Sequence, residues 1–255
     1  LIRWANLIQP KTLEKFNQRI VQLAVERKVT SGRKLRTDGT VVASNICAPS
    51  DNRLLADGVR VLARTVVRAR ALLKRTIQEP FEDFTQTAKR LARQIGETLH
   101  KKTDTARLAG RQQYQELLDM TRKTVEWADT TKKQLLKCRE AKAQRLAQTL
   151  ETCLPRTQQV IEQTMRRILQ GEQVPASEKI VSLFEEHTDI IRRGKESRPV
   201  EYGHKIWLNE VEGGLVSHYR ILAGNPSDEQ QWKPSLHAHL KTFHQPPRQA
   251  SGDRG

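Results

Sequence analysis

Residues 34–46, KLRTDGTVVASNI, decide the fold, because they break the helical pattern of the residues before them. The run TVV at 40–42 is β-branched, and such residues favour strands. The dipeptide Asp38-Gly39 indicates a tight change of direction. We therefore predict a strand within 34–46, with Asp38 on it or beside it.

Helical patterning follows this strand. Ser50 or Asp51, in the turn CAPSDN at 47–52, is expected to cap the next helix, because a short polar side chain accepts the free N–H groups of a first helical turn. From about 53 to 193 glycines are few and prolines number only three, which predicts long helices. Breaks are expected near 77–81, 153–156 and 171–176, with 104–152 forming one or two long helices of a coiled-coil-like hairpin.

Two alternating runs mark a β-hairpin near the end of the chain. They are KIWL at 205–208 and LVSHYRIL at 215–222, and Gly213-Gly214 lies between them. A helix is then predicted through about 243, capped by Ser227 or Asp228. Residues 248–253 are expected to lead into a further strand.

The charge balance favours a polyanionic partner. The chain has 45 basic and 29 acidic residues, a net charge of +16. Aromatic residues make up only 5%, and no window approaches ~18 consecutive apolar residues, so nucleic acid is favoured over a membrane. Residues 59–198 contain 29 basic and 18 acidic residues. This net of +11 predicts a phosphate-contacting helical face, although a merely solvated face is the simpler alternative.

Cysteine and histidine patterns exclude several kinds of site. The three cysteines, Cys47, Cys138 and Cys153, are odd in number and far apart, which argues against a disulfide framework or a cysteine zinc site. His237 and His239 are two positions apart on a predicted helix and so face different sides. No Gly-Lys-Ser/Thr follows Gly213-Gly214, so a phosphate-binding loop is not indicated.

Three segments resemble a known family when they are taken together. LRTDGTVVASNICAPSDNRLLADGVRVLAR (35–64) resembles the first catalytic motif of DDE transposases from bacterial insertion sequences, in particular the ISNCY group. YGHKIWLNEVEGGLVSHYRILAGNPSDEQQWKPSL (202–236) resembles the hairpin and following helix of that family, and SGDRG (251–255) the strand end with its second catalytic Asp. Between these segments, the helical middle fits the family by length and charge only.

This resemblance implies a fold and a set of site residues. The fold is an α/β RNase H-like core with a mixed sheet, interrupted by a long, mostly helical insertion. Asp38 corresponds to the first catalytic, metal-binding carboxylate and Asp253 to the second. The third is a Glu on a later helix, and this sequence ends two residues after Asp253, so we expect the chain to lack it. Taken alone, Asp38 and Asp253 are each weak evidence for a catalytic site, because Asp-Gly is an ordinary turn and Gly-Asp-Arg-Gly also suits a loop.

The implied activity is metal-dependent phosphoryl transfer on DNA. Two Mg²⁺ (or Mn²⁺) ions, ~3.5–4 Å apart, would hold the attacking and leaving oxygens on one phosphorus. The implied partners are terminal inverted repeats and target DNA, bound by a homodimer in the bacterial cytoplasm, at the nucleoid. Relatives tend to have His-Tyr-Pro-Thr-Asp where this chain has CAPSD at 47–51, and an Asp where it has Asn209. With the Glu missing, we expect this chain to be inactive.

The predicted organisation has four parts. A truncated helical segment at 1–33 precedes the first part of the core at 34–58, the basic helical insertion at 59–198, and the truncated continuation of the core at 199–255. Two other interpretations remain open. One is a non-catalytic, purely helical DNA-binding protein, which the hairpin and the run at 40–42 disfavour. The other is an RNase H-like nuclease, which the sequence separates poorly from a transposase.

Overall fold

The computed structural model describes residues 8–73, 80–192 and 199–252. It divides into two compact units. We call Leu1–Ser44 with Asp189–Gly255 the sheet unit, and Asn45–Thr188 the helical unit. The predicted insertion at 59–198 differs from the helical unit at both ends, because the segment after Ser44 already groups with the helices and the chain returns to the sheet at Asp189.

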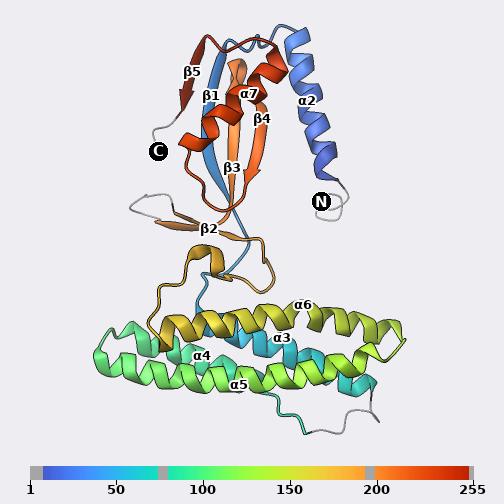
Figure 1. Ribbon diagram of the computed structural model, residues 1–255, viewed down its shortest axis with the longest axis vertical. Helices are drawn as coiled ribbons and strands as arrows, with labels where there is room; N and C mark the ends of the chain where they lie inside the picture. Colours follow the sequence, from blue (N-terminus) through green and yellow to red (C-terminus); the bar gives the residue numbers. More distant parts are fainter. Residues whose placement is uncertain (1–7, 74–79, 193–198, 253–255) are drawn as a thin grey trace. The chain divides into compact units, whose positions relative to one another are not determined.

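A mixed five-stranded sheet forms the described part of the sheet unit (Figure 1). Its strands are β1 (Lys34–Ala43), β2 (Asp189–Arg192), β3 (Val200–Val211), β4 (Leu215–Leu222) and β5 (Gln249–Gly252). β3 is antiparallel to β1, β2 and β4, whereas β5 is parallel to β1. The chain is therefore mixed α/β, and the purely helical alternative is wrong.

Strand β1 runs straight through Asp38 and Gly39, so the predicted change of direction at this dipeptide is wrong. Burial alternates along the strand, with Leu35 and Thr37 each 1% exposed and Asp38 exposed. Such alternation is the period-2 pattern of a strand with one face covered. Gly39 is opposite Trp207 on β3, and a Cβ at Gly39 would lie 3.3 Å from the indole ring. Close approach of this ring, and not a turn, accounts for the glycine.

The predicted hairpin is confirmed as β3 and β4. Its turn contains Gly213 (φ 79°) and Gly214 (φ 72°), a backbone region that glycine adopts without steric cost. The first strand is longer than the predicted run, and a register shift between Asn209 and Glu210 marks a β-bulge.

Helix α7 (Trp232–Phe243) covers the face of the sheet that carries the buried β1 residues (Figure 1). The indole N–H of Trp207 donates to Ser235 Oγ (2.8 Å), and Asn209 Nδ2 donates to the Ser235 carbonyl (3.3 Å). Neither Ser227 nor Asp228 caps α7, which begins after a short 3-10 turn at Glu229–Gln231. Asp228 instead pairs with Lys205 (2.6 Å).

Helix α2 (Pro10–Glu26) packs beside β4 and lies within the helical segment predicted at 1–33. Asn17 Nδ2 donates to the Ser217 carbonyl (3.3 Å), and Val21 is 2% exposed. Several of its apolar side chains are exposed, including Phe16 (60%) and Ile20 (53%).

Four long helices build the helical unit: α3 (Asp51–Leu72), α4 (Thr85–His100), α5 (Asp104–Leu136) and α6 (Ala141–Thr164) (Figure 1). Apolar residues three and four positions apart face one core. On α3 these residues are Leu55, Val59, Leu62 and Val66, and each is at most 1% exposed. Gly58 lets α3 approach α6, since a Cβ there would lie 2.7 Å from Thr157 Cγ2. None of the described helices combines the length and apolar character needed to cross a membrane.

Two of the three predicted helix breaks are observed. α3 ends at Leu72 and α4 begins at Thr85, and a one-turn π-helix at Met165–Leu169 ends before Gly171 (φ 75°). The break predicted near 153–156 is wrong, because α6 continues through Pro155. Burial of Leu154 (3%) and Thr157 (0%) on either side of Pro155 holds the helix in place, offsetting the lost hydrogen bond. The chain turns instead at 137–140, which no Pro or Gly marks.

Candidate metal centre on the sheet

Asp38 lies in the middle of β1, on the face that points away from α7. Its strand neighbours Thr37 and Gly39 are buried on the α7 face, whereas Asp38 is exposed beside Leu208, its partner on β3. Within the described residues the Asp38 carboxylate makes no hydrogen bond or ion pair. A strand carboxylate without a partner is free to bind a hard cation such as Mg²⁺.

Strand β5 brings the end of the described chain beside Asp38. The parallel register pairs Leu35 with Ala250 and Thr37 with Gly252, so the described pairing reaches the residue before Asp38. A Cβ at Gly252 would lie 3.0 Å from Thr37 Oγ1 and 2.6 Å from Trp232 Cζ2, which places Gly252 on the α7 face. Because side chains alternate along a strand, Ser251 is on the face of Asp38. Asp253, the other candidate carboxylate, lies outside the described residues.

Glu212 is the carboxylate best anchored in the sheet unit. It accepts hydrogen bonds from Thr30 Oγ1 (2.7 Å) and from the Lys34 backbone N–H (3.0 Å). Burial alone would raise the pKa of Glu212, but these hydrogen bonds outweigh it and lower the pKa below its usual value. Glu212 therefore ties the start of β1 to the β3–β4 turn, which is a structural role.

Nothing in the described residues completes a metal site beyond Asp38. No group of three or more His, Cys, Asp or Glu side chains in 8–73, 80–192 or 199–252 could hold a metal ion. The donor set is thus one free strand carboxylate in the described chain, together with a second carboxylate, Asp253, that the sequence supplies next to β5. Oxygen donors of this kind fit Mg²⁺ or Mn²⁺.

The histidines of α7 are dispersed, in agreement with their sequence spacing. His239 is 1% exposed and its Nε2 donates to the Gly32 carbonyl (2.8 Å), while His237 is exposed. Burial lowers the pKa of His239 below its usual value, although the bond to Gly32 acts in the opposite direction. His239 therefore joins α7 to the loop before β1.

Sequence reasoning missed a buried polar network in the helical unit. Asp51 was expected to cap α3, but its side chain is 4% exposed and binds Gln163 Nε2 (2.9 Å) and Arg167 Nη1 (2.6 Å). Gln163 also bonds both backbone groups of Ile180. Burial, followed by the charge of Asp51, raises the pKa of nearby Tyr114 to about 12. The partners lie more than a hundred positions from Asp51, so no local signal could have revealed them.

The basic excess is shared between the two units. Residues 45–188 contain 26 basic and 18 acidic residues, a net of +8, which is half of the chain's +16. The net of +11 for 59–198 is larger because that range includes residues 189–198, whose net of +2 belongs to the sheet unit, and leaves out residues 45–58, whose net is −1. Several helical-unit cations, including Arg64 and Arg68 on α3, are exposed and have no ion-pair partner in the described chain.

Comparison of the chain with protein-family models, with curated proteins and with solved structures finds no match.

Proposed function

We propose that this chain is the RNase H-like core and helical insertion of a DDE transposase, as its resemblance to the ISNCY group implies. One observation carries the proposal. β5 is parallel to β1 and pairs Thr37 with Gly252, immediately before the two aspartates that the resemblance assigns as catalytic, Asp38 and Asp253. These residues are 215 positions apart in the sequence, and the register was not part of the resemblance.

The order of elements supports the RNase H-like assignment. A strand with an Asp is followed by an antiparallel hairpin, a helix that covers one face, and a strand parallel to the first. The helical unit is inserted between β1 and β2. This is the sequence of elements that the resemblance predicts, with the exposed Asp38 carboxylate on the side of β1 that points away from α7.

The chemistry follows from the carboxylates. Asp38 and Asp253 would hold Mg²⁺ or Mn²⁺, which would supply activation of the attacking oxygen and charge stabilisation of the leaving 3′ oxygen. The exposed cations of the helical unit would bind the phosphates of the terminal inverted repeats, and the active assembly would be a homodimer on paired ends.

The effect of Mg²⁺ on DNA affinity tests the metal site without requiring catalysis. Affinity for a duplex would be compared in Mg²⁺ and in NaCl of equal ionic strength, for the wild type, Asp38→Asn and Glu229→Gln. Glu229 is a matched control, since it is exposed and unpaired in the described part of the sheet unit. We expect Mg²⁺ to raise the affinity of the wild type and of Glu229→Gln, because a bound ion cancels the repulsion between Asp38 and phosphate. An identical Mg²⁺ response in Asp38→Asn would refute the site.

Inverted repeats on either side of the reading frame would distinguish a transposase from a nuclease with the same fold. The proposal expects them, since an insertion sequence is bounded by the ends that its transposase binds.

A further inference from the structure

A groove of about 890 Å³ lies in the helical unit, between α3 and α4. Segments 45–50 and 181–185 form its other walls. A volume of this size is within the roughly 300–1,000 Å³ of sites that bind small ligands. All of its lining residues belong to the helical unit, so the groove is complete within that unit.

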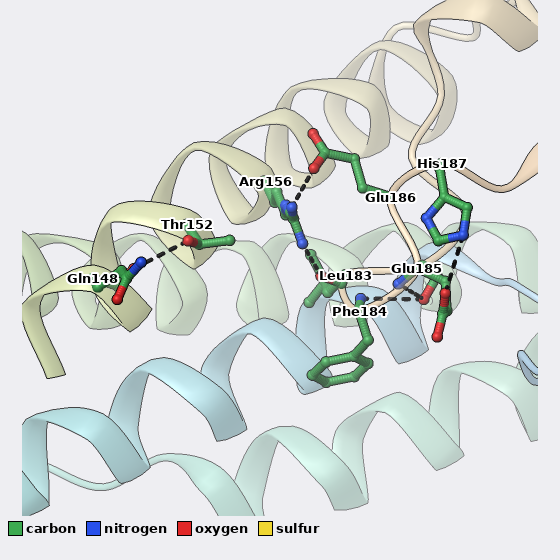
Figure 2. Close-up of polar contacts among 9 residues, drawn as sticks. Gln148, Thr152, Arg156, Leu183, Phe184, Glu185, Glu186 and His187 are labelled. Atoms are coloured by element: carbon green, nitrogen blue, oxygen red, sulfur yellow. Dashed lines mark hydrogen bonds and ion pairs between the residues drawn. The ribbon is translucent and has the colours of Figure 1, made fainter. Parts of the chain in front are cut away.

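Phe184 stands in this groove with 55% of its surface exposed. Figure 2 shows its ring turned away from Arg156 and toward α3. The guanidinium carbon of Arg60 lies 5.6 Å from the ring centroid. An exposed phenylalanine loses the stabilisation that burial would give it. Arg60 lies over this ring, but more than half of the residue's surface is open to a flat ligand.

The loop that carries Phe184 is firmly anchored (Figure 2). Arg156 on α6 donates to the Leu183 carbonyl (2.8 Å) and also pairs with Glu186. Ser182 Oγ accepts hydrogen bonds from the backbone N–H groups of Phe184 (3.2 Å) and Glu185 (3.1 Å). Leu183 is 3% exposed and packs into the core. The ring is thus pre-positioned, which reduces the entropy lost when a ligand stacks on it.

The cations of the groove differ in whether they are already paired. Arg60 binds Asp57 (2.8 Å), and Arg93 binds Glu97 (2.9 Å). Arg53 on α3 and Lys89 on α4 line the two sides of the groove, are exposed, and have no ion-pair partner within the described residues. Two unpaired cations and one exposed ring match a ligand that has an anionic group and an aromatic group.

We propose that this groove binds an unpaired nucleotide of a single-stranded nucleic acid, with its base on Phe184 and its phosphate between Arg53 and Lys89. Unpaired cations beside an aromatic platform are the elements by which proteins bind single strands, and Arg53 and Lys89 supply such cations next to Phe184. In a duplex the bases are stacked on one another, so Phe184 cannot reach their faces. The inference rests on the proposed function only in taking nucleic acid as the partner, and it is independent of the metal site.

The test measures the affinity of the full chain for dye-labelled single-stranded oligo-dT and for a duplex, by fluorescence anisotropy in EDTA. We expect Phe184→Ala to weaken single-strand binding about tenfold and Phe184→Trp to retain it, because stacking on one aromatic contributes ~1–3 kcal/mol per base. Duplex affinity should be unchanged in both. Leu108→Ala is the matched control, since Leu108 is an exposed apolar residue on α5 (63%), outside the groove.

A second pair of variants tests the phosphate contact. Arg53→Gln/Lys89→Gln should weaken single-strand binding and reduce its dependence on salt. Lys142→Gln/Arg145→Gln, which removes the same charge from exposed positions of α6, should have a smaller effect.

Unchanged single-strand affinity in Phe184→Ala, or an equal loss in Leu108→Ala, overturns the inference but leaves the proposed function standing if the wild type binds duplex. A wild type that binds neither nucleic acid contradicts both.

Discussion

Thr37 and Gly252 pair across the parallel strands β1 and β5, although 215 positions separate them in the sequence. The pairing is close, because a Cβ at Gly252 would lie 3.0 Å from Thr37 Oγ1 and 2.6 Å from the indole of Trp232. Only a residue without a side chain fits between β1 and α7 at this point. The glycine in the motif SGDRG is therefore required by packing, and it holds the strand that leads to Asp253 beside Asp38.

Gly252→Ala should destabilise the sheet unit by about 1–3 kcal/mol, because the added methyl group overpacks the site against Trp232. Chemical denaturation followed by tryptophan fluorescence would measure the change. Trp232→Phe removes the clashing atom, so the double variant should lose less stability than the sum of the losses of the two single variants. Strict additivity of the two substitutions would contradict the packing argument.

Arg167→Met should cost about 1–2 kcal/mol of stability in the helical unit. It leaves the buried Asp51 carboxylate without its cation, although Arg167 itself is 38% exposed and its contribution is partly screened by solvent. Adding Asp51→Asn should recover part of the loss, because the amide carries no charge. Arg107→Met, which breaks the exposed pair with Asp104, is the control and should change stability by less than about 0.5 kcal/mol. Thermal unfolding followed by circular dichroism would detect these differences.

The stability of the sheet unit should fall as the pH drops below the usual histidine pKa of about 6.5. Burial lowers the pKa values of His239 and His218 in the folded chain, so the unfolded chain binds protons more readily in this range. The contribution of these histidines to stability is then fully present above pH ~6.5. It is lost as the pH falls toward their lowered pKa values in the folded chain. His239→Gln should reduce this dependence, and exposed His237→Gln should leave it as in the wild type. Urea midpoints measured between pH 8 and about pH 5 would test both.

Arg64→Gln/Arg68→Gln should weaken duplex binding and flatten its salt dependence. Each lost phosphate contact lowers the slope of log K against log salt by about 0.9 for B-DNA. The control is Lys233→Gln/Lys241→Gln, which removes the same charge from exposed positions of α7. Equal slopes for both double variants would show that α3 does not form the phosphate-binding face.

Local signals predicted most of the sheet but not β2 (Asp189–Arg192), which lies in the region predicted as helical. The β-branched run at 40–42 and the glycine pair between two alternating runs located β1 and the β3–β4 hairpin, because strand and turn preferences act within a few residues. Pro155 misled the prediction of a helix break, since burial on both sides outweighs the loss of one hydrogen bond. The contacts of Asp51 with Arg167 and the anchoring of Phe184 by Arg156 and Ser182 depend on tertiary packing, which residue patterns do not contain. Asp38 could be proposed from its motif, but its free, outward-facing carboxylate became evident only from the strand register.

Mn²⁺ binding by Asp38 and Asp253 is the most direct test of the account. Electron paramagnetic resonance would titrate Mn²⁺ into the wild type, Asp38→Asn, Asp253→Asn, the double variant and the control Glu229→Gln. If the two aspartates share one metal centre, each single variant loses the same binding event, the double variant loses nothing more, and the control binds as the wild type. Wild-type Mn²⁺ binding in Asp38→Asn, or independent additive losses from the two aspartates, would contradict the claim that β1 and β5 together form a metal centre.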